Sequence, residues 1–556
     1  MAGALPGNAG ALPPSPRTED ILKYTQWRTL PIKQNGSLAN SILAARGMTG
    51  EYTMLHDPLL LPDMQKAADR IKRAIKSREK IAVYGDYDVD GVTATCLLVD
   101  YLRSKGIDCI YFIPDRIEMG YGLHTEALAK IKERGATLVV TVDVGVTAFE
   151  AALAARDMGL DLIITDHHTC RDTLPAALAV VNPKRADSQY PFANLAGVGV
   201  AFKLICALEG EIEDLLERYA DLVALGTVAD IVPLIDENRY LTRRGLETLG
   251  KRKSIAQLLA LQGKEGKPVT PVAISYGIAP MLNAAGRMKN AKLALELLMS
   301  TDKEHTRYLA IQLNDLNEQR REIETVMLRQ ALEMCAKSGD SAPSIVLKHK
   351  DWHPGITGIL ASKLMERYRK PIFLITYNGE KAKGTARCPK HIDLTELLGQ
   401  CEDTLLGFGG HSAAAGFTVY TSRIDEFTAA IQSAAAMAKQ LPHEEALIID
   451  AIVSPKEITK QSAEEIAAIG PFGAGNPEPV LQLNRAVIDR IIPLKDGKHL
   501  RMNITAEGLN RTVVCFGFSF DSFPYQAGDT VDLAFKISLN DFRRETVVQM
   551  ELIDIR

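Results

Sequence analysis

Short apolar runs alternate with helical stretches from about Lys80 onward, and this alternation constrains the fold more than any other feature of the sequence. The runs KIAVYG, CIYFIP, TLVVTVD and DLIITDHH are typical of buried strands, whereas VTATCLLVDYL is typical of a helix. Strands that alternate with helices predict a parallel sheet in an α/β layer fold. Because such sheets carry their chemistry at the carboxyl ends of the strands, acidic residues at those ends are candidate functional residues.

The remainder of the chain shows three further patterns. Residues 303–337 contain no Pro or Gly and repeat apolar residues near helical spacing, which predicts one long helix. That helix is either a surface helix of one domain or a strut between two lobes. A second α/β region runs from SIVLKH through PIFLIT to GGHSAAAGF. After Leu441, about five short alternating strands predict a small β-barrel of the OB type.

Composition sets the broad class. A length of 556 residues corresponds to about three or four domains. The eight cysteines are scattered without regular spacing, which favours a reducing cytosol over a disulfide framework. The N-terminal segment lacks the pattern of a signal peptide, and no apolar run is long enough to cross a membrane. With a net charge of −4, any contact with DNA must come from local basic patches or bound metal ions.

The first strand is followed by Gly85-Asp86-Tyr87-Asp88-Val89-Asp90-Gly91, in which three carboxylates occupy alternate positions. Such a cluster of like charges is costly unless a cation balances it, and oxygen ligands favour hard ions. An EF-hand calcium loop also begins DxDxDG. It needs a glutamate at its twelfth position, where this chain has Leu97, and a preceding helix, where this chain has a strand. A purely structural turn is the remaining alternative.

Three further motifs place acidic or imidazole side chains at the ends of apolar segments. Asp143 closes the strand TLVVTV, where it is either a ligand or a helix cap. Asp166, His167 and His168 follow the strand DLIIT. Neighbouring side chains of an extended chain point to opposite sides, so if His167 faces a metal, His168 faces something else, such as a phosphate. Asp230 lies where the helix DLVALGTVA breaks, and alone it could be a helix-end carboxylate.

Together these motifs supply five or six carboxylates and one or two imidazoles, enough for two metal ions as in many phosphoryl hydrolases. The sequence has no serine elbow, no HExxH and no P-loop. Gly197-Val198-Gly199 lacks the third glycine of a dinucleotide-binding motif and follows no clear strand, so we interpret it as packing. The pattern predicts a metal-dependent phosphoesterase.

The ordered motifs DYDVDG, VDxG, DHH and GTVADIVPL resemble those of the DHH phosphoesterase superfamily. Its DHH-associated domain is expected to follow, with HPGITGILASKL (353–364) and Gly409-Gly410-His411-Ser412. Two segments resemble the RecJ family of single-strand-specific 5′→3′ DNA exonucleases: LNAAGR (282–287) and PFGAGNPEP (471–479). The likeness runs from about residue 48 to the C-terminus.

This resemblance implies roles for individual residues. The implied metal ligands are Asp86, Asp88, Asp90, Asp143, His167 and Asp230, with Asp143 bridging two ions. The implied catalytic residues are His168 as a phosphate contact, Arg116 near the reacting phosphate, and Asp166, which orients His167 from behind. Arg287, Arg387, Gly410 and His411 resemble the pocket for the 5′ end of DNA. The mixed oxygen and nitrogen ligands suit two Mn²⁺ or Mg²⁺ ions, and imidazole favours Mn²⁺.

The chain departs from the family pattern at three places. Val144 stands where the family often has Asn, and Met281 where it often has Arg, and neither change removes a proposed ligand. The segment Gly384-Thr385-Ala386-Arg387-Cys388 replaces the more usual serines, which weakens the assignment of hydroxyl contacts to the DNA end.

The expected fold class is α/β, in five segments. These are a flexible arm (1–47), a DHH parallel-sheet catalytic domain (48–245), a helical region with a long linking helix (246–338), a DHH-associated α/β domain (339–440) and an OB-like barrel (441–556). Residues 481–556 are electrically neutral, with ten Lys plus Arg and ten Asp plus Glu. Phe516, Phe518 and Phe520 are expected to share one face of a barrel strand, either as core or as a stacking surface, with Arg501, Arg511, Arg543 and Arg544 lining one side.

The expected function is 5′→3′ hydrolysis of single-stranded DNA to 5′-mononucleotides by two metal ions, in DNA repair and recombination. Alternatives are an oligonucleotide or cyclic-dinucleotide phosphodiesterase of the superfamily, a manganese pyrophosphatase, and a non-catalytic DNA-binding scaffold. The first two would not need the extra domains, and the third typically loses carboxylates that this chain retains. Expected partners are single-stranded DNA with a free 5′ end, a single-strand-binding protein and a helicase. We expect a cytoplasmic monomer without membrane contact.

Overall fold

A computed structural model of the chain describes residues 24–31, 36–48, 55–338, 342–377, 379–438, 446–542 and 545–556. The chain divides into two compact units. The larger unit comprises Tyr52–His443 and Pro471–Asn476, and the smaller unit comprises Met1–Glu51, Glu444–Gly470 and Pro477–Arg556. The smaller unit is therefore assembled from both ends of the sequence.

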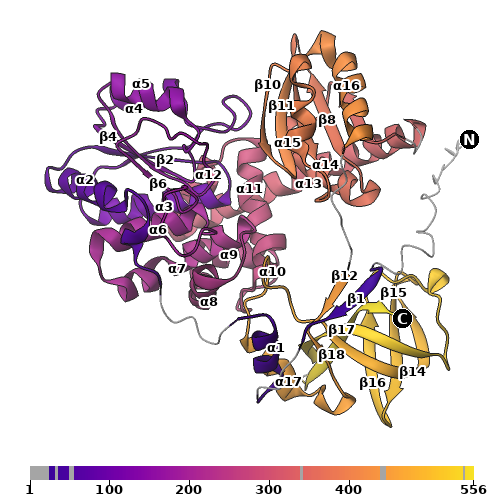
Figure 1. The fold of residues 1–556 in the computed structure, drawn as a ribbon. Helices are drawn as coiled ribbons and strands as arrows, with labels where there is room; N and C mark the ends of the chain where they lie inside the picture. The colour runs from indigo at the N-terminus through magenta and orange to yellow at the C-terminus, as the bar shows by residue number, and fades with distance from the viewer. Residues whose placement is uncertain are drawn as a thin grey trace, which may run out of the picture. The chain divides into compact units, whose positions relative to one another are not determined.

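A five-stranded parallel sheet forms the centre of the first lobe of the larger unit (Figure 1). Its strands lie in the order β3 (Ile110–Phe112), β2 (Ile81–Gly85), β4 (Leu138–Val142), β5 (Asp161–Thr165) and β6 (Ala179–Val181). Along β2, Ile81 and Val83 enter one apolar cluster and Ala82 and Tyr84 enter another. Since both faces are buried, the strands are continuous apolar runs, as parallel strands usually are. The predicted parallel sheet is confirmed.

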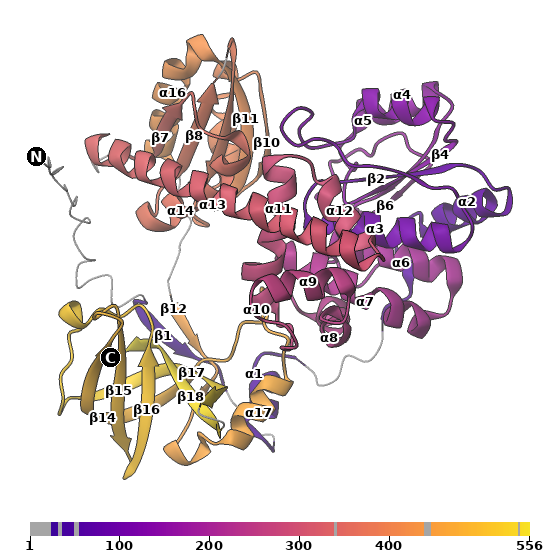
Figure 2. The same cartoon turned by 180° about the vertical axis from the view of Figure 1, so that it is seen from behind.

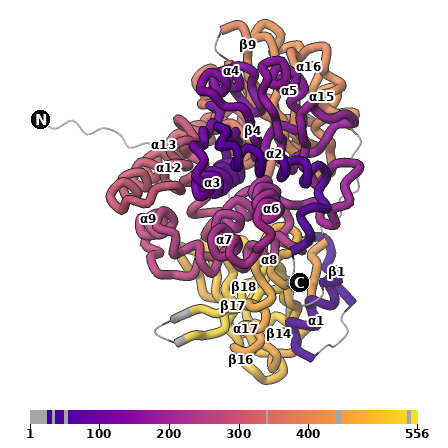
Figure 3. The backbone as a smooth tube through the Cα atoms, turned by 90° about the vertical axis from the view of Figure 1, so that its left-hand side faces the viewer, coloured from indigo at the N-terminus to yellow at the C-terminus, as the bar shows by residue number. Residues whose placement is uncertain are grey.

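Helices cover both faces of this sheet. α4 (Thr125–Glu133) and α5 (Phe149–Asp157) lie on one face, while α2 (Met64–Lys76), α3 (Val89–Ser104) and α6 (Gly197–Glu209) lie on the other (Figure 1). Beyond them, α7 (Ile212–Ala229) packs beside α3 and α6 (Figure 3). The lobe is completed by α8 (Asp236–Leu249), α9 (Lys253–Leu261), α10 (Pro271–Ala273), a π-helical turn (Ile274–Ile278), α11 (Ala279–Met288) and α12 (Lys292–Met299).

The helix α13 (Lys303–Ser338) joins the two lobes of the larger unit (Figure 2). It packs against α9, α11 and α12 of the first lobe and against α14 and β7 of the second. Of the two predicted roles for this helix, the strut between lobes is confirmed.

The second lobe is built on a mixed sheet of order β10-β11-β9-β8-β7. Its strands are β7 (Ile345–His349), β8 (Ile372–Tyr377), β9 (Lys381–Arg387), β10 (Gly407–His411) and β11 (Ala414–Tyr420), and its helices are α14 (Pro354–Tyr368), α15 (Leu394–Gly399) and α16 (Ile424–Met437). β7 and β8 pair in parallel and the other neighbours are antiparallel.

The smaller unit contains a closed five-stranded barrel. The strands β14 (Leu481–Leu494), β15 (His499–Ala506), β16 (Leu509–Cys515), β18 (Glu545–Ile555) and β17 (Thr530–Phe542) pair in that order, and β17 pairs back onto β14. The predicted OB-like barrel is confirmed. The unit also holds α1 (Leu38–Ala45), β13 (Ala451–Ile452), α17 (Lys460–Ala468) and a parallel pair made by β1 (Gln26–Thr29) and β12 (Ala446–Ile449).

The prediction of a flexible arm over residues 1–47 is wrong for residues 24–31 and 36–47. Trp27 in β1 donates its indole N–H to Asp554 Oδ2 at 2.7 Å. Arg46 after α1 forms a bidentate ion pair with the buried Asp450, with N–O distances of 2.6 and 3.0 Å. Hydrogen bonds from the far end of the chain thus order a segment whose composition alone is typical of a flexible arm.

The prediction that Phe516, Phe518 and Phe520 share a strand is also wrong. β16 ends at Cys515, and Gly517 follows at φ 81°, a left-handed conformation that takes the chain out of the sheet. Phe516 and Phe520 are 49% and 46% exposed, so they do not belong to the barrel core. Of the four arginines proposed beside them, Arg543 and Arg544 lie outside the described residues.

Among the residues that the structure describes, no helix combines the length and the apolar character needed to cross a bilayer.

Candidate metal centre and substrate pocket

The acidic loop after β2 turns directly into α3. Asp86 follows the strand, and Asp88 caps the helix by accepting a hydrogen bond from the Gly91 N–H at 3.1 Å. A Cβ on Gly91 would lie 2.6 Å from the Asp86 carbonyl oxygen, so only glycine permits this tight turn. Since a strand precedes the motif and Leu97 is buried in the core, the EF-hand alternative is excluded.

Asp90, in the first turn of α3, is held by the start of another helix. Its two carboxylate oxygens accept hydrogen bonds from the N–H groups of Gly197 at 2.6 Å and Val198 at 2.8 Å, the first residues of α6. The partial positive charge of a helix N-terminus favours a carboxylate at this position. The interpretation of Gly197-Val198-Gly199 as packing is therefore incomplete, because these amides fix a predicted ligand.

Asp143 directly follows β4 in the left-handed backbone region, at φ 62°. Its N–H bonds the Thr165 carbonyl at 3.0 Å, and its side chain is buried. A Cβ on Gly197 would approach the Asp143 carboxylate to 2.5 Å, so Gly197 leaves the space that this carboxylate occupies. Asp143 does not cap α5, whose N-cap is Ala148, and the helix-cap alternative is wrong.

The carboxylate of Asp166 holds the imidazole ring of His168. The prediction that it orients the ring of His167 is wrong, because Asp166 contacts only the backbone N–H of that residue. Its Oδ1 lies 2.7 Å from His168 Nδ1 and also accepts the backbone N–H groups of His167 and His168 at 2.7 and 3.1 Å. Oδ2 accepts the N–H of Val146 at 2.9 Å. The loop therefore turns immediately after β5, which brings the second histidine ring back to the aspartate.

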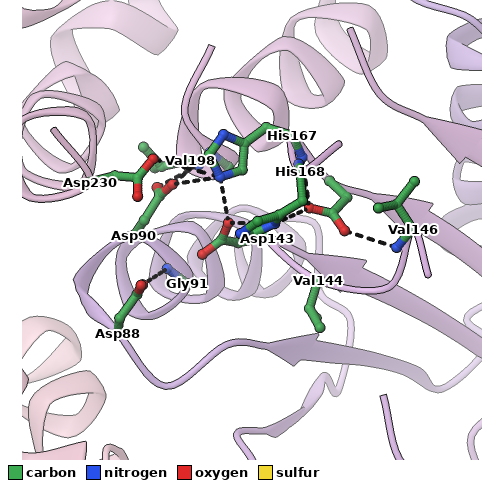
Figure 4. A network of polar contacts seen from close by, with 12 residues as sticks. Asp88, Asp90, Gly91, Asp143, Val144, Val146, His167, His168, Val198 and Asp230 are labelled. Atoms are coloured by element: carbon green, nitrogen blue, oxygen red, sulfur yellow. Dashed lines mark hydrogen bonds and ion pairs between the residues drawn. The ribbon is translucent and has the colours of Figure 1, made fainter. Parts of the chain in front are cut away.

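The imidazole of His167 lies at the centre of the acidic groups (Figure 4). Its Nε2 lies 3.2 Å from Asp143, 3.6 Å from Asp230 and 3.9 Å from Asp90. Asp230 reaches the cluster from the C-terminal end of α7, as predicted. Because β2, β4 and β5 are adjacent in the sheet, their carboxyl ends bring residues from three distant motifs together.

The donor atoms fit metal ions. Three sets have ligand atoms within 4.8 Å of one another: Asp143, His167 and His168; Asp90, His167 and Asp230; and Asp86, Asp88 and Asp143. Asp86 Oδ1, Asp143 Oδ1 and both ring nitrogens of His167 are buried without a hydrogen-bond partner among the described residues. Buried polar atoms without partners are costly unless something else binds them. Oxygen and imidazole donors suit a divalent cation.

Burial makes the charges of this cluster expensive. It raises the pKa of Asp90 to about 7 and of Asp230 to about 8, and neighbouring carboxylates add to the effect. The pKa values of Asp86 and Asp143 are also raised well above the usual range, first by burial and then by nearby aspartates. Burial lowers the pKa of His167 to about 3, so its ring is neutral and offers a lone pair. Protons or cations must therefore balance the carboxylates.

Comparison with known proteins decides the family. The DHH family N-terminal domain matches residues 80–227, the DHHA1 domain matches 341–437 and the RecJ OB domain matches 449–554. The single-stranded-DNA-specific exonuclease RecJ of Bacillus subtilis is 37% identical over 93% of this chain and 67% of its own length. The Escherichia coli protein of the same name is 34% identical over 89% of this chain and 90% of its own length.

This chain belongs to the RecJ family. The crystal structure of Thermus thermophilus RecJ in complex with Mn²⁺ superposes with a TM-score of 0.82 at 29% identity, covering 96% of this chain and 79% of that chain. The same protein is also known in complex with Mg²⁺. The predicted family and fold class are confirmed.

A cavity of 530 Å³ lies between the two lobes of this RecJ-family chain, within the larger unit. Its walls include Tyr87, Arg116 and Tyr121 of the first lobe and Gly355, Thr357, Lys383, Thr385 and Gly409 of the second. The hydroxyl groups of Thr357 and Thr385 are 3.1 Å apart. Threonines thus place hydroxyls in this cavity although the serines common in the RecJ family are absent.

Of the predicted arginines, Arg116 lines this cavity, and Arg287 and Arg387 lie next to residues that line it. Arg116 lies over the Tyr87 ring at 4.9 Å, Arg287 donates to the Gly355 carbonyl at 3.2 Å, and Arg387 donates to Ser362 Oγ at 3.2 Å. None of the three forms an ion pair with a carboxylate in the part of the chain that is described. The pKa of Arg287 is lowered to about 9, first by burial and then by the neighbouring arginines. Such a concentration of unbalanced positive charge favours an anion.

The other two residues predicted for the DNA end lie elsewhere. His411 stacks on His168 with ring centroids 6.5 Å apart, so it lies beside the metal cluster and does not line the cavity. Gly410 adopts φ 151°, and a Cβ there would meet the Ala414 carbonyl at 2.3 Å. The hairpin between β10 and β11 therefore gives a structural reason for this glycine.

The sequence analysis did not predict several residues that shape the metal cluster. Tyr121 places its hydroxyl 3.2 Å from His168 Nδ1. The segment 471–476 belongs to the larger unit and not to the barrel that it precedes. There, Leu234 donates its N–H to the Ala474 carbonyl at 2.7 Å, and Gly475 approaches Pro233 closely, which fixes the turn after Asp230. The glycine-rich composition of this segment was the available signal, because glycines often mark close approaches.

Proposed function

We propose that this chain hydrolyses single-stranded DNA from its 5′ end to 5′-mononucleotides, as a metal-dependent exonuclease acting in DNA repair and recombination. The observation that carries the proposal is the convergence of three acidic motifs on His167, with buried side-chain atoms that have no hydrogen-bond partner among the described residues. The names of the RecJ relatives, single-stranded-DNA-specific exonucleases, support the substrate.

The proposed cofactor is a pair of divalent cations, with Mn²⁺ favoured over Mg²⁺ because His167 contributes a nitrogen ligand. Asp86, Asp88 and Asp143 would hold one ion, and Asp90, His167 and Asp230 the other, with Asp143 close enough to both sets to bridge them. When bound, such a pair polarises a phosphodiester and makes water a better nucleophile.

The protein's own groups position the phosphate. We assign His168 as a phosphate contact, because its ring lies at the edge of the cluster and is held by Asp166. Burial lowers the pKa of His168, but the hydrogen bond and the charge of Asp166 outweigh burial and raise it to about 9. The ring is therefore positively charged at neutral pH and attracts an anionic oxygen. Arg116 is the proposed second cationic contact.

The proposed site for the 5′ end is the cavity between the lobes. Arg116 lines it, Arg287 and Arg387 lie next to its lining residues, and Thr357 and Thr385 offer hydroxyl donors. His411 is proposed to contact the strand where it passes from this cavity to the metal cluster, since it stacks on His168. Tyr121 lines this cavity and lies 3.2 Å from His168 Nδ1, so the cavity adjoins the metal cluster, and we propose that it takes the end of the strand.

For the barrel we propose a supporting role with long strands, through exposed aromatic side chains such as Phe516. A single-strand-binding protein and a helicase are the proposed protein partners, and the proposed state is a cytoplasmic monomer.

The decisive test is digestion of single-stranded DNA labelled at either end, with Mn²⁺. We expect the 5′ label to appear at once in mononucleotides and the 3′ label to remain on gradually shortened strands. Hydrolysis confined to dinucleotides or cyclic dinucleotides would instead support the phosphodiesterase alternative. Binding without any hydrolysis would support the non-catalytic scaffold, and release of the 3′ label first would reverse the proposed polarity.

A further inference from the structure

A second cavity, of 570 Å³, lies in the first lobe between α3, α7, α9 and the end of α12. We call it the α9 cavity. Its residues on α3 are Cys96, Asp100 and Arg103, whereas the metal cluster uses Asp90 at the other end of the same helix. Ten residues of helix separate Asp90 from Asp100, which is roughly 15 Å along the axis. The α9 cavity is therefore distinct from the catalytic site.

Positive charge dominates the walls of the α9 cavity. Five cationic side chains line it, against two carboxylates. Both carboxylates are already balanced: Asp221 forms a bidentate pair with Arg252 at 2.6 and 2.9 Å, and Asp100 pairs with Arg218 at 2.7 Å. The remaining cations, Arg103, Lys251 and Lys253, have no carboxylate partner among the described residues. An anion would complete the balance.

The N-terminus of α9 opens into the same cavity. This helix begins at Lys253 without a capping side chain. Its second residue, Ser254, lines the cavity and is 1% exposed, and its hydroxyl oxygen is buried without a hydrogen-bond partner in the described structure. A buried hydroxyl without a partner is costly, and beside the free N–H groups of a helix start it matches the oxygens of a phosphate.

The volume of the α9 cavity and its apolar lining residues indicate a ligand larger than a free phosphate ion. A volume of 570 Å³ lies within the range of small-molecule sites. Leu222, Leu298 and Met299 supply apolar surface in the same cavity. α12 packs against both α9 and α3.

We propose that the α9 cavity binds the phosphomonoester of a small molecule, for which a nucleoside monophosphate is the representative ligand. The phosphate lies at the start of α9 against Ser254, with Lys251 and Arg103 at the rim, and the remainder of the ligand contacts the apolar wall. A volume of 570 Å³ matches a small molecule better than a continuous DNA strand.

The test is calorimetric titration of the full chain with deoxyadenosine 5′-monophosphate in EDTA. We expect two binding events, one in the α9 cavity and one in the cavity of the proposed 5′-end site. Lys251→Glu should weaken one event about tenfold or more, since it reverses a charge that would contact phosphate. Arg387→Ala should weaken only the other.

Two variants keep the result interpretable. Ser254→Ala removes only the hydroxyl and should weaken the same event as Lys251→Glu while leaving the melting temperature unchanged. Lys264→Glu is the matched control, because Lys264 is an exposed lysine just beyond the other end of α9 that does not line the cavity. It should leave both events unchanged.

Location and ligand class are checked by hydrogen exchange. Bound monophosphate should protect residues 248–254 from exchange. The proposal is overturned if binding is insensitive to both Lys251→Glu and Ser254→Ala, or if only Arg387→Ala affects it. It is also overturned if a single-stranded oligonucleotide without a 5′ phosphate protects residues 248–254 and the monophosphate does not, because the site would then bind a DNA backbone.

Discussion

Asp143 combines two constraints that rarely coincide in one residue. Its backbone is left-handed, and its carboxylate is buried among the carboxylates of Asp86, Asp88, Asp90 and Asp230. A left-handed conformation costs most residues about a kilocalorie per mole or more, but Asn and Asp tolerate it best. This backbone preference makes asparagine a better test of the side chain's chemistry than alanine.

Asp143→Asn should lower hydrolysis of single-stranded DNA by more than about a hundredfold, the loss that groups merely supporting a metal ligand can cause. The fold should persist, and in EDTA the melting temperature should rise, because one of several repelling carboxylates is gone. Nuclease assays with Mn²⁺ and thermal unfolding in EDTA measure the two effects. Turnover near that of the unaltered chain would refute the bridging role.

Gly197→Ala should disturb the same carboxylate from the opposite side. The new Cβ would lie 2.5 Å from the Asp143 carboxylate, so either the start of α6 or Asp143 must move. We expect a loss of about 1–3 kcal/mol in unfolding free energy and a large loss of activity. Gly199→Ala is the control, since its Cβ would meet only the flexible Leu195 side chain at 3.3 Å. Equal activity of the two variants would contradict this assignment.

The sequence predicted the acidic ligands because strand ends can be located from apolar periodicity, and adjacent parallel strands must bring their ends together. It did not predict the role of Gly197, whose partner Asp90 lies 107 positions away. It also assigned Asp166 to the wrong ring. Which of two adjacent histidines meets the aspartate depends on how the loop turns after β5, and alternation along a strand does not determine that.

At the level of elements, a buried glutamate of α13 pairs with a cation of the same helix and with a cation of the second lobe. Arg320 donates to Glu324 at 2.7 Å within the helix, and Lys363 of α14 pairs with the same glutamate. Arg320 and Glu324 are almost fully buried. One carboxylate therefore balances cations from two elements.

Glu324→Ala should lower the free energy of unfolding by about 3 kcal/mol, because it leaves Arg320 buried without its partner. Urea denaturation measures the change. The exposed neighbour Glu322 provides the control, since Glu322→Ala should alter stability by less than about 0.5 kcal/mol. Similar values for the two variants would mean that the buried pair contributes nothing measurable to stability.

The position of β9 and α14 leads to a prediction on strand length. Arg387, at the end of β9, is held by Ser362 of α14 beside the proposed 5′-end cavity. Arg387→Ala should reduce cleavage of short strands several-fold more than cleavage of long strands, because long strands retain other contacts. Kinetics on a length series decide the point. Lys390→Ala, three residues away and exposed, should show no such trend, and a uniform loss with Arg387→Ala would argue against an end pocket.

Elements were predictable where periodicity is long and regular, as in α13 and the first sheet. The end of β16 was not predictable from the sequence. Phe516, Phe518 and Phe520 continue the alternation of a strand, but the backbone leaves the extended conformation at Gly517. Side-chain alternation reports a face only while the chain stays extended.

For the whole molecule, the smaller unit depends on both ends of the chain. Deleting residues 1–47 should destabilise this unit by about 3–5 kcal/mol, because Asp450 loses Arg46 and the buried Asp554 loses Trp27. Limited proteolysis with mapping of the cut sites should show faster cleavage within residues 446–556. Deletion of residues 1–20 keeps these contacts and serves as the control. Unchanged protection in both truncated chains would contradict the dependence.

The pairing of β1 with β12 also determines when, during synthesis, β1 can find its partner strand. Residues 26–29 leave the ribosome hundreds of residues before their partners at 446–449. At a usual rate of elongation this gap lasts roughly 20 to 80 seconds. Throughout that time the nascent chain carries a strand without its neighbour, while the larger unit emerges behind it. A chain that stops short of residue 446 therefore lacks the partner strand for its own N-terminal segment.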